Sequence, residues 1–232
     1  MTTPYAQSDW RTPAVVIVTG CLIAVLGFGI RSSFGLFLEP MTSARGWSRE
    51  TFALALAIQN LMWGIGVLVA GAIADRFGAA KVIMFGALLY AAGLYGMSLA
   101  QTGTALHLTA GVLTGAGVAF TAFSLAMAAM ARVVGPEKRS MVLGLGTAAG
   151  SCGQVLFSPL SQGFISSFGW QDALLLQAGI ALLLIPLAMA LPMRNQTAQS
   201  DSNELTLAAA VSEAFAHRGF VLLTAGLSLI HI

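Results

Sequence analysis

The feature that most constrains this chain is a succession of apolar runs, each long enough to cross a bilayer as a helix. About 20 apolar residues cross a hydrocarbon core of ~30 Å. Charged side chains make up only 9% of the chain, whereas a soluble domain carries about 25%. The sequence therefore predicts an all-α membrane protein that crosses the bilayer several times.

Six runs predict six transmembrane helices, which together would form an N-terminal bundle over residues 1–193. The predicted spans are residues 14–38, 51–73, 82–100, 105–130, 141–166 and 173–193. A polar stretch at 194–218 predicts a cytoplasmic linker between two halves of a larger protein, and a frayed tail is the alternative. The apolar run 219–232 makes only about 21 Å of helix. We therefore expect it to be the truncated start of a seventh span, whose last residues, SLIHI, need not be native.

The basic residues between the spans predict the orientation of the chain, because cytoplasmic loops are enriched in lysine and arginine. With a cytoplasmic N-terminus, two basic residues lie outside, Arg45 and Arg49, and eight lie inside. The inside residues are Arg11, Arg76, Lys81, Arg132, Lys138, Arg139, Arg194 and Arg218. We expect a multi-pass protein of a cell membrane, specifically a bacterial inner membrane, with the lipid bilayer as its first partner.

Arg31 is the charged residue that falls inside a predicted span. It follows seventeen uncharged residues, Ala14 to Ile30. If the first span ended at Ile30, the next segment would be a water-exposed loop despite its two phenylalanines and two leucines. A span that runs to Leu38 instead measures about 37 Å and places Arg31 about 10 Å below its outer end. The longer span is the better physical fit.

A charge at that depth is costly and points to function. Gly20, Ala24, Gly27 and Gly35 share the helical face of Arg31 and leave room for its side chain in a watery cavity. There the guanidinium could hold a carboxylate in two parallel hydrogen bonds. The alternative is that Arg31 reaches up to the outer lipid headgroups.

Other polar residues within the spans are further candidates for the substrate path. On the second span these are Gln59, Asn60 and Trp63. On the fifth span, one helical stripe carries Ser151, Gln154, Ser158, Ser161 and Gln162. We rank Gln59, Trp63, Gln154 and Ser158 beside Arg31 as candidate substrate-binding residues. Each of them could equally form a hydrogen bond between helices.

The sequence lacks the motifs that are typical of several other functional classes. It contains no phosphate-binding loop of the Walker type, and its three histidines are scattered. We predict no catalytic residue, no metal site, no cofactor and no nucleic-acid partner. An intramembrane enzyme is thus a minor alternative. A complete six-span protein that acts as a homodimeric carrier or scaffold is another.

The segment between the second and third spans carries the most specific motif. It reads GAIADRFGAAKV and resembles the signature loop of the major facilitator superfamily, roughly Gly-x-Leu-Ala-Asp-Arg-x-Gly-Arg-Lys. The matching residues are Gly71, Ala74, Asp75, Arg76 and Gly78. The sequence departs from the signature where alanines occupy both basic positions and Lys81 comes one place late. Glycines permit close helix approach and a sharp turn, and Asp75 and Arg76 can pair with neighbouring helix ends.

Further segments, among them RSSFGLFLEPM and FGWQDALL, are similar to the oxalate/formate antiporter and monocarboxylate transporter branch of that family. The resemblance implies twelve spans in two halves, each an inverted pair of three-helix repeats, so this chain would lack the C-terminal half. It implies a secondary transporter of a small organic anion, a monocarboxylate or dicarboxylate, by alternating access without ATP. A proton or a counter-anion would be coupled to transport. The gating loop would comprise Gly71, Asp75, Arg76, Gly78 and Lys81, although it could be simply a charged turn that sets topology. We expect the bare 232-residue chain not to transport.

Overall fold

The computed structural model describes residues 11–192 together with positions 216 and 219. The chain divides into two compact units, residues 1–195 and 196–232, and all elements described below belong to the first unit. Apart from those two positions, the predicted linker 194–218 and the predicted seventh span 219–232 lie outside the described residues. The domain boundaries drawn from the sequence therefore stay predictions.

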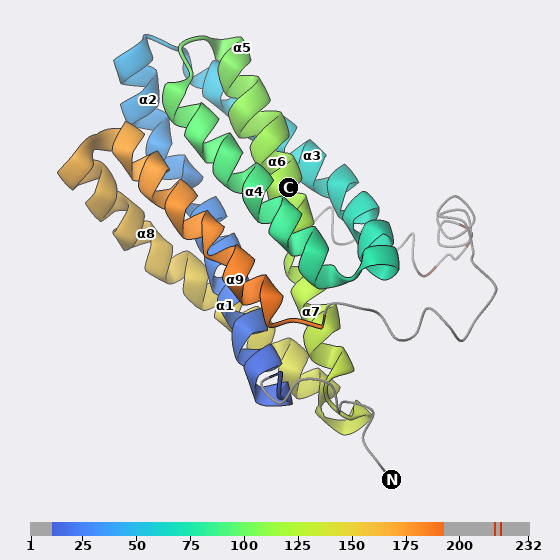
Figure 1. The fold of residues 1–232 in the computed structure, drawn as a ribbon. Coiled ribbons are helices and arrows are strands. Elements are labelled where there is room, and N and C mark those ends of the chain that lie inside the picture. Colours follow the sequence, from blue (N-terminus) through green and yellow to red (C-terminus); the bar gives the residue numbers. More distant parts are fainter. Residues whose placement is uncertain (1–10, 193–215, 217–218, 220–232) are drawn as a thin grey trace. The chain divides into compact units, whose positions relative to one another are not determined.

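Residues 11–192 form helices joined by short turns and contain no strand (Figure 1). The structure thus has the predicted all-α class. Two elements depart from α geometry: η1 is a 3-10 helix and η2 is a π-helix. In chain order, the elements are α1 Pro13–Ser32, η1 Ser33–Phe37, α2 Leu38–Arg45, α3 Arg49–Phe77, α4 Ala79–Leu99, α5 Gly103–Leu106, η2 His107–Leu113, α6 Thr114–Phe120, α7 Phe123–Arg132, α8 Pro136–Leu182 and α9 Leu184–Met189.

Local sequence explains where the long helices begin and end. The Thr12 hydroxyl accepts a hydrogen bond from the backbone of Val15 and caps α1, and Pro13 supplies a first helical residue that needs no amide hydrogen. Ser48 caps α3 in the same way. Gly78 ends α3 and begins α4 with a φ of 93°, a conformation that favours glycine. The glycine of the predicted signature loop therefore makes the sharp turn expected of it.

The first helical run continues past Arg31, as the sequence predicts. The elements α1, η1 and α2 follow one another without a break from Pro13 to Arg45. The hydroxyls of Ser32 and Ser33 donate to the carbonyls of Gly29 and Ile30, 2.8 Å away in each case. The side chains thus satisfy backbone carbonyls where the helix tightens to 3-10 geometry. The alternative that the span ends at Ile30 is wrong.

Five helical runs among the described residues are long and apolar enough to cross a membrane, and the last contains 54 residues, Pro136–Met189. A straight helix of that length would measure about 81 Å, more than twice the hydrocarbon core. The run instead folds back at Gly169 (Figure 1). With a φ of 83°, Gly169 is the one residue within α8 whose backbone is not helical. The run thus supplies the fifth and sixth predicted spans. The loop expected between them shrinks to a single glycine turn.

The fourth predicted span is not one regular helix. It consists of α5, the π-helical η2, α6 and α7, with a break at Thr121 and Ala122 between the last two. Gly111 and Gly115 lie directly against α3, where an added Cβ would meet Ile58 and Gln59 at 2.9 Å and 2.8 Å. Their spacing of four residues places both glycines on one helical face, where small residues allow close packing. The expectation of one regular helix over 105–130 is corrected: His107–Leu113 has π geometry, and the chain breaks at Thr121 and Ala122.

A buried polar cluster joins the first span to both arms of the last run. The Gln177 amide nitrogen donates to the hydroxyls of Ser33 and Ser161, at 2.9 Å and 2.8 Å. All three residues are fully buried. Ser161, one of the stripe considered for the substrate path, therefore takes part in a buried contact between helices. By contrast, large apolar side chains such as Val155, 72% exposed, face outward, as expected of a bundle whose solvent is lipid.

Candidate functional site

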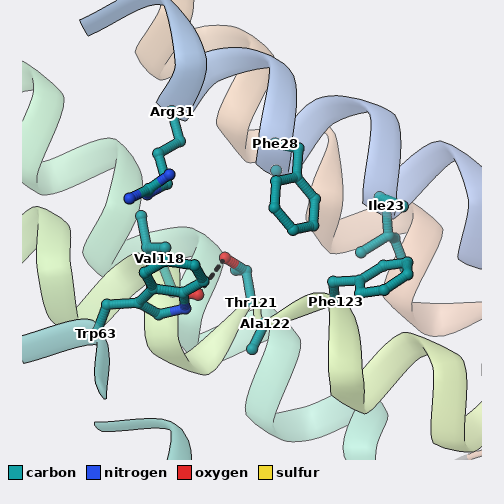
Figure 2. A pocket seen from close by; sticks show the side chains of 10 residues that line it. Ile23, Phe28, Arg31, Trp63, Val118, Thr121, Ala122 and Phe123 are labelled. Carbon is teal, nitrogen blue, oxygen red and sulfur yellow. Dashed lines mark hydrogen bonds between the residues drawn. The ribbon is translucent and has the colours of Figure 1, made fainter. Parts of the chain in front are cut away.

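A pocket forms where α1, α3 and the broken fourth span meet, and Arg31 reaches into it (Figure 2). Its volume is about 20 Å³, more than one water molecule needs. The residues that line it are Ile23, Ala24, Gly27, Phe28, Arg31, Trp63, Val118, Thr121, Ala122 and Phe123. Two of these, Ala24 and Gly27, belong to the small-residue stripe predicted beside Arg31. The stripe therefore does leave room for the arginine.

The Arg31 side chain is held by contacts that leave its charge uncompensated. Its Nη2 donates a hydrogen bond to the Asn60 side-chain oxygen at 2.6 Å. Its guanidinium carbon lies 4.3 Å from the centre of the Trp63 ring, a cation–π contact. Within residues 11–192, Arg31 forms no ion pair, and its Nε has no hydrogen-bond partner. A guanidinium without a carboxylate partner attracts anions.

The rest of the pocket is largely apolar. In Figure 2, Arg31 and Trp63 lie at one end, and Phe28, Phe123 and Ile23 lie toward the other. The rings of Phe28 and Phe123 meet edge to face, with their centres 5.5 Å apart. The pocket thus has one charged end and an apolar remainder.

The break in the fourth span contributes the wall opposite α1. Thr121 ends α6, and its hydroxyl donates to the Gly117 carbonyl at 2.8 Å. Ala122 has an extended backbone, with φ −53° and ψ 134°, before α7 begins. Non-helical backbone at membrane depth is tolerated where it is buried in protein or lines a cavity. No glycine or proline occupies positions 118–123, so sequence reasoning had no signal from which to predict this break.

The structure brings together some of the predicted substrate-binding residues and separates others. Arg31 and Trp63 share the pocket. Gln59 is buried between helices, away from the pocket lining, and its side-chain nitrogen has no partner among the described residues. Gln154 and Ser158 lie on an exposed face of α8 and do not line the pocket. Their part in substrate binding stays a prediction.

The structure decides which amide of the second predicted span contacts Arg31, a choice that the sequence left open. Gln59 and Asn60 lie four and three residues before Trp63, so both are near its helical face. Asn60 makes the hydrogen bond to Arg31. The rotation of α3 decides between the two, and helical spacing alone does not reveal that rotation.

The predicted gating loop adopts a defined geometry at the other end of α3. Asp75 forms an ion pair with Arg132 at the end of α7, with 3.5 Å between their charged atoms. The guanidinium of Arg76 lies 5.4 Å from the ring centre of Phe77, and Lys81 is exposed in the first turn of α4. Pairing of Asp75 with a neighbouring helix end thus occurs as expected. A Cβ built on Gly71 would meet no neighbouring described helix within 4 Å, so the close helix approach that Gly71 permits stays a prediction.

Comparison with known proteins places this geometry in a family. The family model of the Major Facilitator Superfamily matches residues 20–231. Rat (Rattus norvegicus) monocarboxylate transporter 13 is 28% identical over 171 residues, 74% of this chain and 40% of the relative. Human (Homo sapiens) monocarboxylate transporter 11 is 29% identical over 232 residues, 98% of this chain and 48% of the relative. Mouse (Mus musculus) monocarboxylate transporter 3 is 30% identical over 170 residues, 72% of this chain and 34% of the relative.

The chain spans less than half the length of these curated relatives. All three relatives are mammalian, and they lend no support to the bacterial inner membrane expected from the sequence. They are transporters by name, which removes the ground for an intramembrane enzyme. The chain therefore belongs to the major facilitator superfamily, and its likeness lies with the monocarboxylate transporter branch.

Proposed function

We propose that this chain forms one half of a secondary transporter that moves a small monocarboxylate across a cell membrane by alternating access, without ATP. The observation that carries the proposal is the guanidinium of Arg31, which lies in a pocket without an ion-pair partner among residues 11–192. The names of the relatives agree with a carboxylate as the ligand. The basic residues of the loops favour a cytoplasmic N-terminus.

Arg31 would bind the carboxylate group directly. A guanidinium presents N–H donors in a planar fork, which matches the two oxygens of a carboxylate. The ring of Trp63 lies against the guanidinium and would hold its plane. The apolar end of the pocket, with Phe28 and Phe123, would take the hydrocarbon part of the substrate. A second carboxylate there would have to be buried without a partner, which is costly. The pocket therefore favours monocarboxylates over dicarboxylates.

Uptake by the protein expressed from its full native coding sequence tests this function. Purified protein in liposomes should take up radiolabelled formate, acetate or lactate with saturation kinetics and without ATP, and oxalate should compete weakly. Liposomes preloaded with a counter-anion, or placed in a pH gradient, would show whether exchange or proton coupling drives uptake. Saturable uptake of no monocarboxylate, or a need for ATP, would refute the proposal.

The ion pair between Asp75 and Arg132 would act in the conformational cycle and not in binding. Its side chains are 76% and 41% exposed, and exposed pairs contribute little to stability. The pair nevertheless joins the turn between α3 and α4 to the end of α7. It would hold this end of the bundle together in one state of the transporter and open in the other.

We expect Asp75→Asn to lower the maximal uptake rate about tenfold with little change in KM, because Asp75 does not line the pocket. The double variant Asp75→Arg with Arg132→Asp should recover part of the rate. Glu39→Gln is a matched control, since it removes an exposed pair with Arg49 at the opposite end of α3. An equal loss of rate in the control would contradict a specific gating role.

A further inference from the structure

Asn60 engages the one nitrogen of Arg31 on which each mode of two-pronged carboxylate binding depends. A guanidinium grips a carboxylate either through Nε and Nη2 or through Nη1 and Nη2. Both arrangements use Nη2, each through a different one of its two N–H groups. In this structure Nη2 donates to the Asn60 side-chain oxygen at 2.6 Å, and Nε has no partner among the described residues. The amide oxygen thus takes one of the two Nη2 N–H groups, and with it the position of a carboxylate oxygen in one of the two arrangements.

The geometry of this contact resembles that of a bound ligand. The guanidinium has donors only, so the oxygen and not the nitrogen of the amide must face it. The nitrogen and the oxygen are 2.6 Å apart, close enough for a hydrogen bond from a charged donor. A planar carbonyl oxygen presents the same acceptor geometry as one arm of a carboxylate.

The surroundings allow this contact to break. Asn60 is an exposed residue of α3, so its side chain can rotate away from Arg31 without disturbing a packed core. Arg31 is only partly buried, and its Nε is shielded. A carboxylate that displaced Asn60 could therefore take Nη2 first and recruit a second donor as the guanidinium turned. Trp63 lies against the guanidinium and would keep it in the pocket meanwhile.

We propose that Asn60 is a resident competitor of the substrate: its side-chain oxygen occupies one of the two carboxylate positions on Arg31 and must be displaced for substrate to bind at that position. Asn60 would thereby set the affinity of Arg31 for the substrate. This inference rests on the proposed function, because it takes Arg31 to be the carboxylate site.

Uptake kinetics of the full-length protein, measured with radiolabelled acetate and lactate, test the proposal. Asn60→Leu removes the competing oxygen and should lower KM threefold or more, on the basis that a hydrogen bond to a charged group must otherwise be broken. Asn60→Asp puts a permanent carboxylate on Arg31 and should raise KM at least tenfold. Gln171→Leu is the matched control, since it removes another interhelical amide bond, to the Ser98 carbonyl, away from the pocket.

An increase in the KM of Asn60→Leu, where a decrease is expected, would overturn the proposal. If Asn60 instead positions Arg31 for substrate, Asn60→Leu raises KM. Failure of the proposed function itself looks different, because Arg31→Gln would then leave uptake unchanged. A double variant provides the final check. Substrate should quench Trp63 fluorescence to the same extent in the Arg31→Gln protein and in the double variant Arg31→Gln with Asn60→Leu. A Trp63→Phe variant identifies the signal of Trp63.

Discussion

Replacing Arg31 with glutamine should lower kcat/KM for monocarboxylate uptake about 100-fold in the full-length protein, because loss of one desolvated charge partner costs about 2–5 kcal/mol. Glutamine keeps much of the side-chain length and can still donate to Asn60, but it removes the charge and the fork. Arg31→Lys keeps the charge without the planar fork and should lose about tenfold. The measurement is the initial rate of radiolabelled uptake into liposomes over a range of substrate concentrations.

The chain offers a closely matched control for this variant. Arg45 also lies over a tryptophan, with its guanidinium carbon 5.4 Å from the ring centre of Trp170, and it does not line the pocket. Arg45→Gln should therefore leave kcat/KM close to that of the unmodified protein. Equal losses in the two variants, or no loss in Arg31→Gln, would exclude Arg31 as the carboxylate ligand.

The second large effect is expected on stability, from Gly153→Ala. Gly153 lies in α8 directly against the backbone of α1, and a Cβ built there would overlap the Val25 carbonyl oxygen and lie 2.7 Å from the Val25 Cα. Backbone atoms cannot move aside as a flexible side chain can. We expect a loss of about 3 kcal/mol in the free energy of unfolding, seen as a lower Tm in detergent and a lower yield of folded protein.

Gly163 on the same helix provides the comparison. No described atom lies within 4 Å of a Cβ built on it. Gly163→Ala should therefore change stability by no more than about 1 kcal/mol, with any gain arising from the higher helix propensity of alanine. If Gly153→Ala were equally harmless, the close contact between α1 and α8 would not be a determinant of the fold.

Much of the architecture could be predicted from local sequence because its causes are local. An apolar run crosses a bilayer wherever it occurs, so the class and the approximate spans follow from composition along the chain. Gly78 turns the chain because its backbone conformation favours glycine. Arg31 is identifiable as a candidate because any charge within an apolar run demands an explanation.

Pairing between helices could not be predicted in the same way. Gln59 and Asn60 are adjacent amides on one helix, and helical spacing assigns neither of them to Arg31. The two amides make different contacts because of how α3 packs against α6. Gln59 faces Gly115, and Asn60 is left to form the hydrogen bond with Arg31. The buried contact between Gln177 and Ser33 joins residues 144 positions apart, and such a pair depends on the packing of whole helices.

The sequence by itself therefore determined that this chain is a helical membrane bundle of the major facilitator type with one arginine inside an apolar span. Hydrophobic length, turn glycines and isolated charge act over a few residues and are visible there. Only the tertiary structure decided what surrounds that arginine: Asn60 on its Nη2, Trp63 against its plane, and the wall formed by the break at Thr121 and Ala122. Those positions depend on how helices rotate to bury small residues against one another, a property of the packed bundle and of no single segment.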